Sequence, residues 1–101
     1  MDSEIIFRNV NIDSINFINN RNDIKIDFID SLSTGKFCGY LICSDIRMFT
    51  MSVTEDDDLE FPQFICDVCA SEKDNKMHVS FLGGLYGIKI VCAGIQTEHK
   101  L

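Results

Sequence analysis

Large apolar residues recur at every second position along most of this chain, the pattern of β-strands with one covered face. The clearest run is Ile-Lys-Ile-Asp-Phe at residues 24–28. Further alternating runs lie at 10–17, 46–53, 64–68 and 77–81, and the runs at 37–43 and 86–92 are apolar at both parities. The pattern predicts a strand at each of these places and no helix of three turns.

Residues that favour turns separate these runs. Residues 19–23 are rich in Asn and Asp, which tolerate a left-handed backbone, and residues 72–76 are polar. Gly83 and Gly84 are typical of a two-residue hairpin turn. The apolar parity changes near Asp13 and Ser14, which predicts a β-bulge there.

About seven short strands with short connections predict one all-β domain over residues 1–101, an antiparallel meander that closes as a sandwich or a small barrel. Because residues 37–43 are apolar at both parities, we expect a central strand that is covered on both sides. Alternation places five large side chains in the core: Ile26, Phe28, Phe49, Phe81 and Ile90.

The negative charge is concentrated in one stretch. The formal net charge is −7 and the pI about 4.5, and residues 55–60, Glu-Asp-Asp-Asp-Leu-Glu, supply five carboxylates between two alternating runs. We expect this gap to be an exposed loop with a dense negative field. Such a charge disfavours contact with nucleic acid or an anionic membrane and favours a basic partner protein. A loop that serves only solubility is the alternative interpretation.

The residues expected to contact a partner are Glu55, Asp56, Asp57, Asp58, Glu60 and, as an aromatic anchor, Phe61. Calcium is a further alternative, because carboxylate oxygens are its usual ligands. The stretch lacks the alternating ligand positions, the central glycine and the closing glutamate of an EF-hand loop, and we expect no metal there.

The cysteines are expected to be reduced structural thiols. Five is an odd number, so complete internal pairing is impossible. Cys66 and Cys69 have the Cys-x-x-Cys spacing of zinc and redox sites, but residues three apart on a strand point to opposite faces. Cys38 and Cys43 are likewise opposite in parity. With an N-terminus unlike a signal peptide, this indicates a cytoplasmic protein without a metal or cofactor.

The sequence contains no catalytic motif, and we expect a protein that is not an enzyme. His78 falls on the polar parity of a strand and His99 in the C-terminal tail, and no Gly-x-Ser-x-Gly elbow is present to pair with either. The glycines at 83–87 lack the Lys-Ser/Thr ending and the helix of a phosphate-binding loop.

The order of elements resembles that of small bacterial immunity proteins from toxin–immunity pairs, including those of contact-dependent growth inhibition. The resemblance is carried by Val-Asn-Ile-Asp-Ser-Ile-Asn-Phe at 10–17, by Asp-Ile-Lys-Ile-Asp-Phe at 23–28, by Gly83 and Gly84, by Gly-Ile-Lys-Ile at 87–90 and by Ile95. It implies a non-enzymatic protein that binds and blocks one cognate toxin, often a nuclease with a basic cleft. It implies no particular functional residues.

Two functions are therefore expected. The first is an inhibitory module whose acidic surface occupies the basic, substrate-binding surface of a toxin. The alternative is a small-ligand-binding β-barrel or another acidic protein-interaction module. A chain of 101 residues barely fills an eight-stranded barrel with its own side chains, which argues against a ligand cavity.

Overall fold

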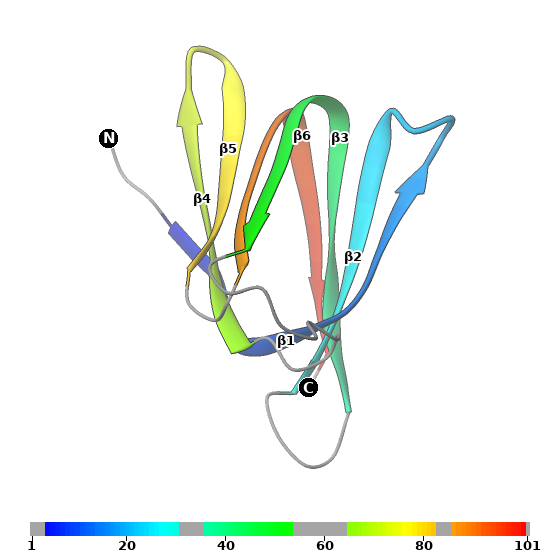
Figure 1. Cartoon of the computed structure of the whole chain (residues 1–101), viewed down its shortest axis with the longest axis vertical. Coiled ribbons are helices and arrows are strands. Elements are labelled where there is room, and N and C mark those ends of the chain that lie inside the picture. Colours follow the sequence, from blue (N-terminus) through cyan, green and yellow to red (C-terminus); the bar gives the residue numbers. More distant parts are fainter. Residues whose placement is uncertain (1–3, 31–35, 54–64, 83–85, 101) are drawn as a thin grey trace.

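The computed structural model describes residues 4–30, 36–53, 65–82 and 86–100, nearly all of them in antiparallel strands (Figure 1). The six strands are β1 (Glu4–Ile18), β2 (Asp23–Asp30), β3 (Phe37–Val53), β4 (Ile65–Lys73), β5 (Lys76–Leu82) and β6 (Tyr86–His99). They pair in the order β1-β2-β3-β6-β5-β4, and β4 returns to β1, so the sheet closes as a barrel. The all-β, antiparallel prediction is confirmed.

β3 and β6 form a long two-stranded ribbon within the barrel. β3 and β6 pair from Gly39 with His99 to Val53 with Tyr86, and the ribbon bends near its centre (Figure 1). The bend lies where Asp45 has a φ of 56° and the register shifts between Ile46 and Met48. The two strands expected at 37–43 and 46–53 are therefore one bent strand, and the described residues form six strands rather than about seven.

The turn residues at 19–21 and 74–75 adopt the left-handed backbone that the sequence indicates. Asn19, Asn20 and Arg21 have φ values of 52°, 58° and 69° between β1 and β2. Asp74 and Asn75 have φ values of 54° and 62°, which matches the twist of a two-residue hairpin between β4 and β5. The bulge expected near Asp13 and Ser14 is confirmed by a register shift between Ile12 and Ser14. Gly83 and Gly84 lie outside the described residues.

The interior is filled by apolar side chains from all six strands. Four of the five expected core residues, Ile26, Phe28, Phe81 and Ile90, are buried. The fifth, Phe49, is half-buried and packs against them. The ring of Phe28 lies 4.5 Å from the ring of Phe7 and 6.1 Å from that of Phe81, centre to centre, so aromatic contacts join β1, β2 and β5.

The strand segment 37–43 is not covered on both sides, and that prediction is wrong. Leu41 and Cys43 point into the core and are fully buried, whereas Tyr40 and Ile42 on the opposite face are only half-buried. Phe37 keeps 40% of its surface exposed. A barrel has a single interior, so an apolar residue of outward parity stays at the surface unless another layer covers it.

Candidate interaction surface

The residues predicted to contact a partner, Glu55, Asp56, Asp57, Asp58, Glu60 and Phe61, lie outside the described residues. Their place in the chain is known: they connect β3, which ends at Val53, to β4, which begins at Ile65. The described strands show how charge is distributed over the rest of the chain.

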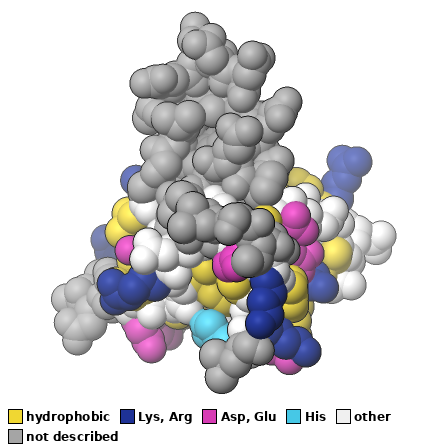
Figure 2. Space-filling model, turned by 90° about the horizontal axis from the view of Figure 1, so that it is seen from below, with side chains coloured by type: hydrophobic (Ala, Val, Ile, Leu, Met, Phe, Trp, Pro, Cys, Tyr) yellow, Lys and Arg dark blue, Asp and Glu magenta, His cyan; other side chains and the backbone are white. Residues whose placement is uncertain are grey.

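The described part of the chain is close to neutral. It contains ten Asp and Glu against nine Lys and Arg, so six of the seven net negative charges lie on Asp2 and on the five carboxylates of residues 55–60. Figure 2 shows basic, acidic and apolar side chains interspersed over one face of the molecule, without a single-sign patch among the coloured residues. The acidic stretch is thus a local charge on a nearly neutral barrel.

Three acidic residues of the described strands, Asp23, Asp45 and Asp67, make structural contacts. The carboxylate of Asp23 accepts hydrogen bonds from the Asp45 amide, at 2.8 Å, and from the side chain of Asn19. These bonds lower the pKa of Asp23, the Asp45 amide first and Asn19 second. Asp45 in turn pairs with Arg47 at 2.9 Å. Asp67 accepts a 2.8 Å hydrogen bond from the amide of Asn9 and so links β4 to β1.

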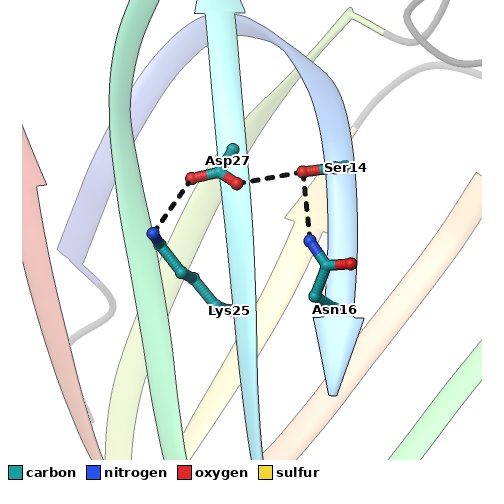
Figure 3. Close-up of polar contacts among 4 residues, drawn as sticks. All are labelled: Ser14, Asn16, Lys25 and Asp27. Carbon is teal, nitrogen blue, oxygen red and sulfur yellow. Dashed lines mark hydrogen bonds and ion pairs between the residues drawn. The ribbon is translucent and has the colours of Figure 1, made fainter. Parts of the chain in front are cut away.

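An ordered polar row crosses the outer face of four strands. Ser14, Asp27, Tyr40 and Glu98 are directly opposite one another on β1, β2, β3 and β6. The Ser14 hydroxyl donates to Asp27 at 2.9 Å, and Asn16 lies 3.4 Å from the same hydroxyl (Figure 3). This arrangement could not be read from the sequence, because it depends on the register of three strand pairs.

Lys25 adds a cation to this polar row and contacts two of its members. The Lys25 ammonium lies 3.8 Å from Asp27 and 4.9 Å from the centre of the Tyr40 ring (Figure 3 shows the first contact). The hydroxyl of Tyr40 bonds to Glu98, which raises the pKa of Tyr40. Each charged side chain of the row contacts another member, so the row orders the outer surface of these four strands.

The second half of β3, residues 48–52, exposes apolar side chains at the surface. Met48 and Met51 keep 44% and 41% of their surface exposed, and Thr50 and Ser52 are also exposed. The only strand paired with this segment among the described residues is β6, because β2 pairs with β3 only as far as Cys43.

The two histidines lie on different strands, His99 on β6 and His78 on β5. His99 is the last residue of β6 rather than part of a tail, which corrects the expectation from sequence. Its ring stacks on Phe7 at 4.4 Å, and Nε2 lies 2.6 Å from the carbonyl oxygen of Ile6. His78 is half-buried opposite Val91, on the outer face. His99 therefore ties the end of β6 to β1.

Four cysteines have side chains that the structure describes. Cys43, Cys69 and Cys92 are buried and Cys38 is half-buried, and none of the four is in a disulfide. The hydrogen bond between the thiols of Cys43 and Cys92, together with burial, raises the pKa of Cys43. Burial and the nearby carboxylate of Asp30 raise the pKa of Cys38. Within the described ranges no three His, Cys, Asp or Glu side chains gather as metal ligands would.

Comparison with known proteins places the fold but names no activity. A protein-family model matches residues 5–99, and its description states no ligand or partner. A crystal structure of an uncharacterized protein from Neisseria gonorrhoeae is similar over 99% of this chain and 100% of that chain, with 26% identity and a TM-score of 0.84. No curated protein matches the chain. The described residues contain no helix with the length and apolar character that a membrane crossing needs.

Proposed function

We propose that this chain, which belongs to the family whose model matches residues 5–99, is an immunity-type inhibitor that binds a basic toxin and blocks it. The observation that carries the proposal is the charge distribution: a nearly neutral barrel bears one acidic stretch of five carboxylates between β3 and β4. Five like charges within six residues repel one another, and a partner of opposite sign relieves that repulsion.

The mechanism proposed is competition for a basic cleft. A nuclease binds phosphate groups with Lys and Arg side chains, and carboxylates on a protein surface can take the same positions and exclude the nucleic acid. Glu55, Asp56, Asp57, Asp58 and Glu60 supply the attraction, and Phe61 is the apolar anchor of the contact. Electrostatic steering speeds association, which is useful when a single toxin molecule is harmful.

The alternative of a ligand-binding barrel has less support. Large side chains with almost no exposed surface fill the interior, among them Phe28, Ile12, Leu41 and Ile88. A site for an apolar molecule would need space where these side chains lie. The filled interior supports a contact made through the surface rather than an enclosed ligand.

The experiment starts from the product of the adjacent gene. That product is expressed with and without this protein, and growth is measured; the proposal requires toxicity that this protein relieves, and binding of the two purified proteins. A harmless neighbour that does not bind would overturn the assignment of the partner.

The contribution of the acidic stretch is then measured in a variant with amides at all five positions, Glu55→Gln, Asp56→Asn, Asp57→Asn, Asp58→Asn and Glu60→Gln. Association should slow at low salt, and the difference from wild type should shrink above 0.1 M salt, where the Debye length falls below about 10 Å. Unchanged kinetics at low salt would remove the stretch from the mechanism.

A matched control separates local from overall charge. The variant with Asp56→Asn, Asp57→Asn and Asp58→Asn is compared with one that carries Glu4→Gln, Asp13→Asn and Glu72→Gln, three exposed carboxylates of the described barrel. Both lose three negative charges. Only the first should slow association, since the second leaves the stretch intact.

A further inference from the structure

Two buried thiols meet where the ribbon of β3 and β6 bends. Cys43 on β3 and Cys92 on β6 have 0% of their surface exposed, and their side chains are hydrogen-bonded to each other. On β3, Cys43 shortly precedes the bend at Asp45. On β6, Cys92 lies opposite Ile46, the residue directly after that bend. The fold therefore brings together two sulfur atoms from opposite ends of the bend.

The surroundings of Cys92 favour its thiolate. The Cys43 thiol and the backbone amides of Gly94 and Ser44 donate hydrogen bonds to the Cys92 sulfur. These bonds, that of Cys43 foremost, lower the pKa of Cys92 against the opposing effects of burial and of the Asp45 carboxylate. The same thiol–thiol bond raises the pKa of Cys43. The first proton lost therefore leaves a thiolate on Cys92 beside an intact thiol on Cys43.

The backbone next to the pair has room to adjust. A Cβ added at Gly94 would meet no atom within 4 Å, and the carbonyl oxygen of this glycine lies 3.3 Å from the Cys92 sulfur. Asp45 on β3 and Ala93 on β6 are exposed at the bend. A small movement here can bring two sulfurs from hydrogen-bonding contact to the covalent S–S distance of about 2.05 Å.

We propose that Cys43 and Cys92 are a redox-sensitive pair that hydrogen peroxide closes into a disulfide across the bend. The Cys92 thiolate attacks one oxygen of the peroxide, the O–O bond breaks, and Cys92 becomes a sulfenic acid while the departing hydroxide takes up a proton and leaves as water. The Cys43 sulfur then attacks the sulfenic sulfur. The S–S bond forms, and the sulfenic hydroxyl leaves as a second water with the proton of the Cys43 thiol. Two electrons pass from the sulfurs to the peroxide.

This disulfide fixes the bend and the strands around it. Cys43 pairs with Ile24 on β2, and Cys92 pairs with Met77 on β5, so the bond forms where four strands meet. It links residues far apart in the chain, which restricts the unfolded state and stabilises the fold. Without an oxidant both thiols stay reduced. The inference goes beyond the proposed function and does not depend on it.

The test compares the reduced protein with protein treated with about one equivalent of hydrogen peroxide. The oxidised chain should remain a monomer and lose about 2 Da, and its melting temperature should rise by on the order of 10 °C. Trypsin places Cys43 in the peptide 37–47 and Cys92 in the peptide 90–100. Mass spectrometry should find these two peptides linked, and a dithiol reductant should separate them and restore the original melting temperature.

The peptide 37–47 also contains Cys38, so Cys38→Ser is the matched control. It should keep the linked peptides and the rise in melting temperature, whereas Cys43→Ser should lose both. In the Cys38→Ser protein a link between the two peptides can come only from Cys43, so the result decides the matter even if Cys43→Ser does not fold. A link to the peptide 48–73, a disulfide between two chains, or thiols that all stay reduced would overturn the inference and leave the pair as core packing.

Discussion

Truncating a buried residue of this barrel should cost far more stability than truncating an exposed residue of the same type. Phe28 is fully buried between Phe7 and Phe81, so Phe28→Ala removes contacts in three strands and leaves a cavity. We expect a loss of about 3–5 kcal/mol in the free energy of unfolding, measured by urea denaturation. Phe37→Ala, at a residue 40% exposed, is the matched control and should cost about 1 kcal/mol or less. Equal losses would mean that the inward and outward faces are misassigned.

Two glycines provide a second contrast at the same scale. Gly39 has a φ of 145°, and a Cβ added there would collide with the carbonyl oxygen of Glu98 on β6. Gly39→Ala should therefore destabilise the barrel by about 1–3 kcal/mol, read from the midpoint of chemical unfolding. Gly94→Ala meets no atom within 4 Å and should be nearly neutral. A neutral Gly39→Ala would contradict the close approach of β3 and β6.

The thiols give a prediction on reactivity. Five free thiols should react with a thiol reagent after denaturation, since we expect no disulfide and no metal. In the folded protein Cys43 and Cys92 should react far more slowly, because both are buried and the pKa of Cys43 is raised. One zinc ion per chain by elemental analysis, or fewer than five thiols after denaturation, would contradict this expectation.

Asp23 acts at the scale of elements, because its carboxylate joins the β1–β2 hairpin to the bend of β3. Its pKa is lowered in the fold, so the charged form is favoured there; the stability this adds is present above the ordinary carboxyl pKa and is lost as pH falls through the folded value. Asp23→Asn keeps an acceptor for the Asp45 amide but cannot titrate. As the pH is lowered from 5 to about 3, the melting temperature of the Asp23→Asn variant should fall less than that of the wild type. Parallel curves would show that other carboxyls cause the acid sensitivity.

Strand patterns are well predicted from sequence where one face is buried. The alternation at 24–28 identifies β2 and its inward residues, and the parity change near Asp13 identifies the bulge. In the sequence, the bend at Asp45 looks like a break between two strands. Ser44 and Asp45 interrupt an apolar run, and this pattern is the same whether the chain turns back or bends within one strand. Only the pairing with β6 on both sides of the bend distinguishes the two.

At the scale of the whole molecule, we expect the charge of the acidic stretch to contribute little to the free energy of unfolding. Ten acidic and nine basic side chains balance over the described barrel, while the acidic stretch adds like charges that repel one another. Neutralising one of them, as in Asp56→Asn, should change the free energy of unfolding by less than about 0.5 kcal/mol, and the change should be towards greater stability. A loss above about 1 kcal/mol in denaturant titration would indicate a structural role for Asp56.

The sequence by itself determined the fold class, the turns at 19–23 and 72–76 and the inward faces of the alternating strands, because these depend on local backbone preferences and on a period of two in apolar residues. It also located the charge, since five adjacent carboxylates need no partner to be recognised. The tertiary structure alone decided that β3 is one bent strand and that Ser14, Asp27, Tyr40 and Glu98 form a row. It also decided that, among the described strands, residues 48–52 pair with β6 and not with β2. Each of these depends on which strands become neighbours and in what register, and residues far apart in the chain settle both.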